Sequence, residues 1–171
     1  MADTNELGPI LHISAEAIGQ PGQRRFRLRV LTDAGPSASL WLEKEQLNSL
    51  GDAIDTVLDD QNYQHQLRPM DDVQEEPVFP LNFSIDFRVT QLSMGLNRDR
   101  ELIVLIASDA PDADDPATTA ISFEFDYRTA YELRAQITTV VAAGRPPCPL
   151  CTGPMDPEGH VCVRTNGHNP H

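Results

Sequence analysis

Long apolar runs are missing from this 171-residue sequence, and so is an excess of positive charge. No apolar stretch approaches the roughly 20 residues that a membrane-spanning helix requires. The sequence has 13 basic and 26 acidic residues, and the resulting net charge of −13 repels nucleic-acid backbones and anionic lipid headgroups. The start, Met1 to Glu6, lacks the basic and apolar regions of a signal peptide. We therefore expect a soluble cytoplasmic protein that binds no membrane.

Cysteine is also scarce. The chain has three cysteines, and all of them lie between residues 148 and 162. An odd number crowded at one end does not fit a framework of disulfides in a secreted domain. The distribution indicates metal or thiol chemistry in a reducing compartment.

What the sequence does contain is a repeated pattern. Segments 38–58 and 121–141 place apolar residues at matching positions when the first is shifted by 83 (38 to 121). In each segment, two apolar residues two positions apart precede a set at steps of three and four. The first spacing is typical of a strand with one buried face, and the second of an amphipathic helix. The matching residues are Leu40, Leu42, Leu47, Leu50, Ile54, Val57 and Leu58 in the first segment, and Phe123, Phe125, Ala130, Leu133, Ile137, Val140 and Val141 in the second.

Two further strands are expected before each strand–helix unit. They are Ile10–Ile18 and Arg24–Leu31 in the first half, and Phe83–Met94 and Leu102–Ala107 in the second. The expected fold is therefore α+β, a duplicated βββα unit of antiparallel strands and one helix each, followed by a zinc-knuckle-like loop. Its parts are the first repeat (1–58), an acidic linker containing prolines (59–82), the second repeat (83–144) and a zinc-binding tail (145–171).

The tail carries the most specific motif in the chain. Cys148 and Cys151 form a CxxC pair, and His160 and Cys162 follow, two residues apart. Structural zinc sites take four soft or borderline protein ligands in a tetrahedron. Residues two apart on an extended segment face the same side, and the Gly and Pro residues between the two pairs can reverse the chain. The spacing predicts one Zn²⁺ held by Cys148, Cys151, His160 and Cys162, with His168 as an alternative fourth ligand.

Other interpretations of this motif stay open. A CxxC pair can be a redox couple, but that motif normally opens a helix, and Pro146 and Pro147 precede it here. The cysteines can also be unligated core residues. A zinc ion with one water ligand would be catalytic, although no carboxylate is obviously placed as its general base. Arg145 and Arg164 give the tail a basic character, which suits either a nucleic-acid contact or the neutralisation of nearby carboxylates.

No catalytic or cofactor-binding constellation is recognisable elsewhere in the sequence. Asp109, Asp112, Asp114 and Asp115 crowd one loop, but they lack the spacing, central glycine and closing glutamate of a calcium loop. There is no phosphate-binding glycine motif and no serine in a nucleophile-elbow context. The aspartate loop is therefore interpreted as a solvated hairpin connection.

Three stretches resemble a known family. GQPGQRRF from residue 19, SLWLEKEQL from residue 39, and AGRPPCPLC followed by DPEGHVCVRTNGH are similar to the bacterial domain-of-unknown-function family 3090. The resemblance covers nearly the whole chain, and its C-terminal motif is the most specific part. Cys148, Cys151, His160 and Cys162 match the family's apparent metal motif. The resemblance implies a soluble bacterial protein and carries no activity or substrate with it.

These patterns favour a non-enzymatic interaction or adaptor protein that has a structural zinc site and a protein partner. Nucleic-acid or nucleotide binding through the basic tail is an alternative, which the net charge of −13 disfavours. A zinc-dependent hydrolase is the second alternative, and it requires an open coordination position on the metal.

Overall fold

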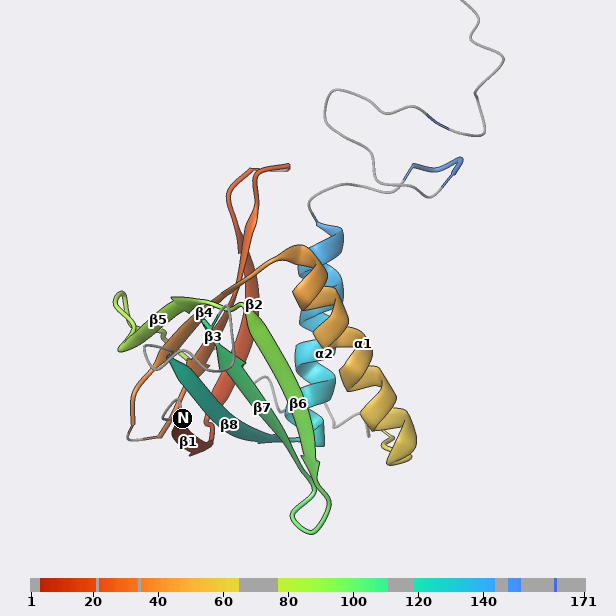
Figure 1. The fold of residues 1–171 in the computed structure, drawn as a ribbon. Helices are drawn as coiled ribbons and strands as arrows, with labels where there is room; N and C mark the ends of the chain where they lie inside the picture. The colour runs from red at the N-terminus through yellow and green to blue at the C-terminus, as the bar shows by residue number, and fades with distance from the viewer. Residues whose placement is uncertain are drawn as a thin grey trace, which may run out of the picture.

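The computed structural model describes residues 4–20, 22–33, 35–64, 77–110, 119–143, 148–151 and 162. This part of the chain is α+β, with two helices and two four-stranded sheets (Figure 1). The strands are β1 (Thr4–Pro9), β2 (His12–Ile18), β3 (Arg25–Leu31), β4 (Ala38–Leu42), β5 (Ile85–Arg88), β6 (Gln91–Asn97), β7 (Leu102–Ser108) and β8 (Ala120–Asp126). The helices are α1 (Lys44–Asp60) and α2 (Tyr127–Ala142).

Each sheet combines three consecutive antiparallel strands with one strand from elsewhere in the chain. The first sheet has the order β2-β3-β4-β5, and β5 runs parallel to β4. The second has the order β1-β8-β7-β6, and β1 runs parallel to β8. The expected α+β class is therefore confirmed, while the parallel pairs β1–β8 and β4–β5 were not part of the prediction.

The chain passes from one sheet to the other at two points, each of them a single peptide bond. Ile10 still bonds to β8 whereas Leu11 bonds to β3, and Val89 bonds to β4 whereas Thr90 bonds to β7. Neither crossing needs a loop, so both sheets share a continuous backbone. The four hydrogen bonds are Ile10 N–H to Glu124 O (3.0 Å), Leu11 N–H to Leu31 O (2.8 Å), Val89 N–H to Trp41 O (2.8 Å) and Thr90 N–H to Ser108 O (2.8 Å).

The second crossing corrects the predicted strand Phe83–Met94. That segment contains all of β5 and the first part of β6, which belong to different sheets. No glycine or proline stands between them, and the apolar alternation continues into Val89, which is buried. At the other end of the chain, β1 was not predicted at all. Its register with β8 shifts between Glu6 and Gly8, where Gly8 has a φ of 67°, so its pattern lacks strand regularity.

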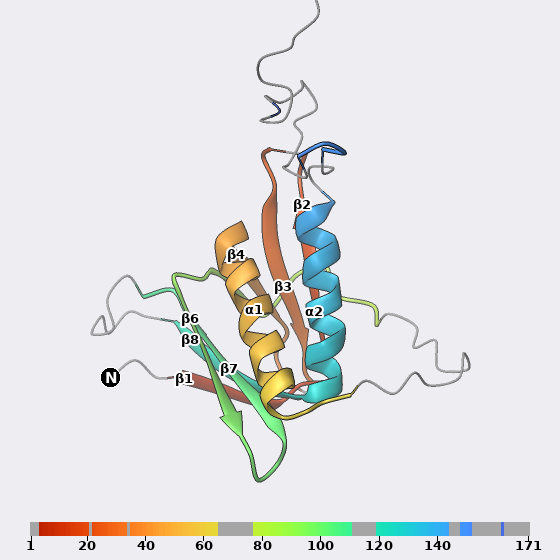
Figure 2. The ribbon, with the colours of Figure 1, turned by 90° about the vertical axis from the view of Figure 1, so that its right-hand side faces the viewer.

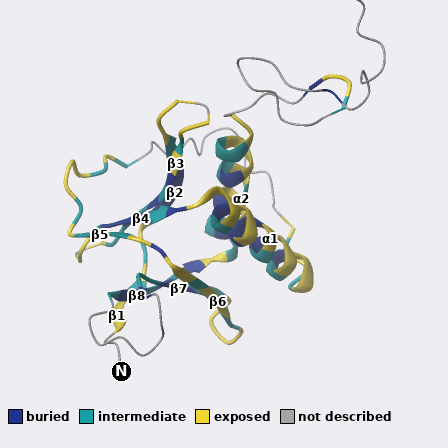
Figure 3. Cartoon of the chain, turned by 45° about the horizontal axis from the view of Figure 1, so that its top comes forward, coloured by how far each residue is buried: buried dark blue, intermediate teal, exposed yellow. Residues whose placement is uncertain are grey.

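The predicted helix stripes are confirmed. Both helices pack their apolar face inward, lie against each other and run in opposite directions (Figure 2). Gly51 of α1 leaves room for the guanidinium of Arg134 on α2, because a Cβ there would lie 2.7 Å from its Nη1 atom. The core comprises both sheets and both helices (Figure 3), and from the two repeated segments it buries Leu40, Leu42, Leu47, Leu50, Ile54, Leu58, Phe123, Phe125, Ala130, Leu133 and Ile137.

Both helices begin directly after a strand of the sheet, and both are capped. Asp126 caps α2, where its carboxylate accepts a hydrogen bond from the Thr129 N–H at 2.8 Å. Glu43 and Gln46 form a reciprocal capping box at the start of α1. These caps fix where each strand ends and each helix begins, as the apolar spacing predicts.

Neither helix in the described part of the chain is long and apolar enough to cross a bilayer. The predicted part boundaries at 58, 82 and 144 stay predictions. Residues 65–76 of the predicted linker, and the helix stop at Gly144, lie outside the described residues.

Candidate metal centre

The three cysteines of the tail lie together. Their sulfur atoms are all within 4.8 Å of one another, and the Sγ atoms of Cys148 and Cys162 are 3.9 Å apart. Cys148 and Cys162 are buried, and Cys151 is half-buried. The cluster therefore joins the CxxC pair to a cysteine that follows it at some distance in the sequence.

The sulfur separation fits a shared metal better than a disulfide. Zn–S bonds of about 2.3 Å at tetrahedral angles place two sulfurs about 3.8 Å apart, whereas a disulfide requires about 2.05 Å. The Cys148–Cys162 distance of 3.9 Å is close to the first value. Three converging thiols are a donor set of the soft kind that Zn²⁺ prefers.

The local backbone at the CxxC pair is a turn. Residues 149–151 are in a turn and not in a helix. A redox CxxC pair normally sits at the start of a helix, where the dipole stabilises the thiolate. The observed turn instead directs both sulfurs toward one point, as in zinc knuckles.

The end of α2 that leads into this segment is tied to the β2–β3 hairpin. Ala143 caps the helix, and Nη2 of Arg24 donates a hydrogen bond to its carbonyl oxygen at 3.3 Å. A cation at a helix C-terminus interacts favourably with the helix dipole. The contact fixes the point from which the chain continues toward Cys148.

The remaining predicted residues of the tail lie outside the described part of the chain. They are the two candidates for the fourth ligand, His160 and His168, and the two basic residues Arg145 and Arg164. The choice between the histidines therefore stays a prediction from spacing. The same holds for the basic character of the tail.

The aspartate loop is described only at its start. The carboxylate of Asp109 accepts a hydrogen bond from the Thr119 N–H at 2.8 Å, and the Asp109 N–H donates to the Thr119 carbonyl oxygen at 3.1 Å. These bonds close the connection between β7 and β8, in agreement with the interpretation of a hairpin loop. Asp112, Asp114 and Asp115 lie outside the described residues.

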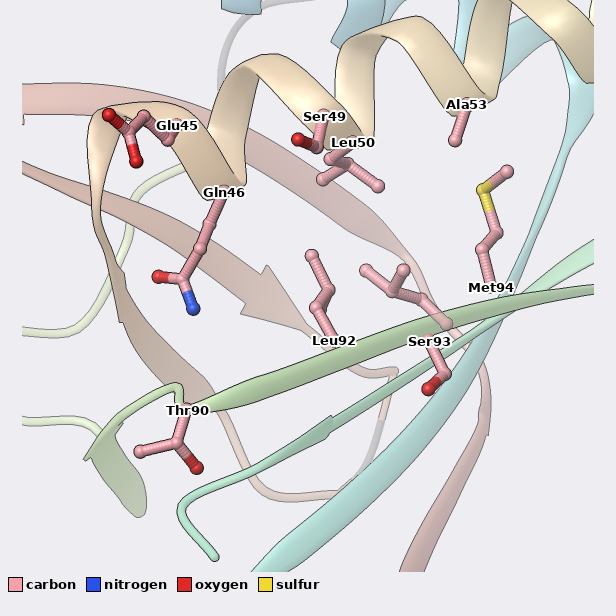
Figure 4. Close-up of a pocket in the computed structure, with 10 residues that line it drawn as sticks. Glu45, Gln46, Ser49, Leu50, Ala53, Thr90, Leu92, Ser93 and Met94 are labelled. Carbon is pink, nitrogen blue, oxygen red and sulfur yellow. The ribbon is translucent and has the colours of Figure 1, made fainter. Parts of the chain in front are cut away.

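One feature that the sequence did not indicate is a cavity of about 470 Å³ between α1 and β6. Figure 4 shows Leu50 and Ala53 of α1 facing Leu92 and Met94 of β6, with Ser93 turned away from the helix. The predicted single strand Phe83–Met94 gave no sign of this cavity, because the cavity forms where the chain leaves the first sheet after β5 and continues as β6 beneath α1. We call it the β6 groove. Its lining residues are Glu45, Gln46, Ser49, Leu50, Ala53, Thr90, Leu92, Ser93, Met94 and Leu105.

Comparison with known proteins gives one match. The model of a family described as "Protein of unknown function (DUF3090)" matches residues 6–162. No curated protein and no solved structure matches the chain. The matched range includes all three clustered cysteines and His160.

Proposed function

We propose that this chain, which belongs to the DUF3090 family of proteins of unknown function, is a non-enzymatic interaction protein braced by one structural Zn²⁺. The observation that carries the proposal is the convergence of the Cys148, Cys151 and Cys162 sulfurs within 4.8 Å. His160 completes the tetrahedron in this proposal, with His168 as the alternative. A protein is the proposed partner.

The donor set supports a structural rather than a catalytic metal. Three thiolates and one imidazole fill all four positions, which leaves no site for a reactive water. Within the described residues, the cluster contains the three thiols and no carboxylate that could act as a base. A short tail segment has almost no core of its own, so metal binding, roughly 10 kcal/mol or more, would supply its folding free energy.

Cobalt substitution tests this proposal. Co²⁺ bound in place of zinc is expected to give the intense visible absorption of a tetrahedral ion with thiolate charge-transfer bands, consistent with three sulfurs and one nitrogen. Addition of azide should leave this spectrum unchanged, because no coordination position is open. A spectrum that changes on azide addition would favour the hydrolase alternative.

We also propose that the body arose by duplication of a βββα unit. The two crossings between the sheets support this proposal. The acceptor of the first crossing, Glu124, and the acceptor of the second, Trp41, are separated by the same 83 positions (41 to 124) as the repeated apolar segments. In each half, three consecutive antiparallel strands lead into one helix.

A further inference from the structure

Each of the two sheets has two edges, formed by β2 and β5 in one and by β1 and β6 in the other. An edge strand presents backbone N–H and C=O groups that can pair with another chain, and proteins protect such edges with short strands, charges, prolines, bulges or a covering helix. A comparison of the four edges therefore shows which of them are protected from pairing with another chain and which is left open to it.

Three of the four edges carry such protection. At β2, helix α2 packs on the strand, and the side-chain oxygen of Gln136 accepts the Ala15 N–H at 3.0 Å. The β5 edge is only four residues long, and two of them, Asp86 and Arg88, are charged. The β1 edge has an irregular register after Glu6 and ends in a proline.

The β6 edge has none of these devices. Its seven residues, QLSMGLN, contain no charge and no proline, and they pair with β7 in a regular register. No strand pairs with its other side in the part of the chain that the structure describes. A Cβ placed on Gly95 would meet nothing within 4 Å, so the face of β6 opposite Leu92 and Met94 is also uncovered at this position.

The two helices also differ in how they cover the edge strands β2 and β6. α2 packs closely on β2, whereas α1 makes no comparable contact with β6 and leaves the β6 groove between them. Leu92 and Met94, two positions apart, share the face of β6 that looks toward α1 (Figure 4). Buried Leu50 and Leu105 contribute to the lining. A volume of about 470 Å³ lies within the range that accommodates a ligand or several side chains.

From these observations we propose that the β6 groove binds an extended peptide segment of a partner protein, which adds to β6 as a further strand. Backbone hydrogen bonds along β6 would hold the segment, and its alternate side chains would enter the groove beneath α1. This inference rests on the proposed interaction function and names the surface that carries it.

Charge defines the chemistry of the partner segment. Among the residues that the structure describes, Glu45 is the only charged one that lines the groove, and the chain carries a net charge of −13. This field attracts a basic segment and repels a second copy of the same chain. The segment should therefore alternate apolar residues with polar ones and carry a lysine or arginine that reaches Glu45.

Selection of short random peptides against the full-length, zinc-containing protein tests the proposal. We expect enriched peptides to show apolar residues at alternate positions and at least one basic residue. In hydrogen–deuterium exchange, the amides of β6 that do not bond to β7 should exchange readily in the peptide-free protein and become protected by the peptide. Met94→Lys should weaken peptide binding by at least about tenfold, since it places a charge in the groove. The matched control Ile106→Lys, on the exposed face of β7, should change binding by less than about twofold.

Four results would overturn the proposal. They are the absence of any enriched peptide, equal binding to the Met94→Lys and Ile106→Lys variants, slow exchange of the outward-facing β6 amides in the peptide-free monomer, and a wild-type dimer that Met94→Lys dissociates. The exchange measurement needs no variant, so misfolding of Met94→Lys leaves the proposal testable. Zinc content is measured on the same samples. If zinc-loaded protein binds no peptide, only the proposed role of the β6 groove is ruled out. If protein that never contained zinc binds peptide, only the proposed structural metal is ruled out.

Discussion

Replacing Cys148 by serine is expected to lower the affinity for zinc by about a hundredfold. Structural zinc sites bind with roughly 10–16 kcal/mol from four ligands, so one ligand accounts for about 3 kcal/mol, which corresponds to about two orders of magnitude. Serine has nearly the shape of cysteine but is a far poorer zinc ligand. Competition with a chromophoric chelator measures the change directly.

The two histidine candidates supply the matched comparison. His160→Ala should lower zinc affinity to a similar degree, while His168→Ala should leave it near the wild-type value. The reverse result would identify His168 as the fourth ligand and keep the metal site. Wild-type zinc affinity in the Cys148→Ser variant would contradict the proposed ligand set, because Cys148 is the buried partner of Cys162 at 3.9 Å.

The second large effect is expected in the core. Phe123→Ala should reduce the free energy of unfolding by about 3–5 kcal/mol, since the ring is fully buried and its removal leaves a cavity. Its counterpart in the first repeated segment, Leu40, is also fully buried, and Leu40→Ala should cost about 2–5 kcal/mol. Both losses are large beside the roughly 5–15 kcal/mol that stabilises a typical domain. Urea denaturation followed by circular dichroism gives the values.

Ile106→Ala serves as the control for these core variants. Ile106 lies on β7 but is 41% exposed, so its truncation removes little buried surface. We expect a loss below about 1 kcal/mol. A loss at Leu40 or Phe123 no larger than that at Ile106 would contradict the assignment of both repeated segments to one shared core.

The helices could be predicted from the sequence because their burial follows the helical period. Leu47, Leu50 and Ile54 recur at steps of three and four, and all are buried in α1. The crossing at Val89 could not be predicted, since a strand that changes sheets keeps its apolar alternation and needs no turn residue. The parallel pairings of β1 and β5 were missed for the related reason that pairing partners far apart in sequence leave no local pattern.

The metal site and the β6 groove also differ in how far the sequence predicts them. The CxxC pair is a local motif whose geometry follows from spacing, so the approach of Cys148 and Cys151 could be predicted from the sequence. The β6 groove depends on how α1 sits relative to β6, which is a tertiary property. Only the absence of charge and proline from QLSMGLN is a sequence signal for an unprotected edge, and it gains meaning once β6 is known to be an edge strand.

Native mass spectrometry of the protein, purified without added metal or chelator, tests the proposed structural zinc site most directly. The predicted mass is that of the chain plus one zinc ion. Chelator treatment should remove the ion and expose three thiols to alkylation that were protected before. A metal-free mass in the purified protein, with all three thiols alkylated at the rate of model thiols, would contradict the account.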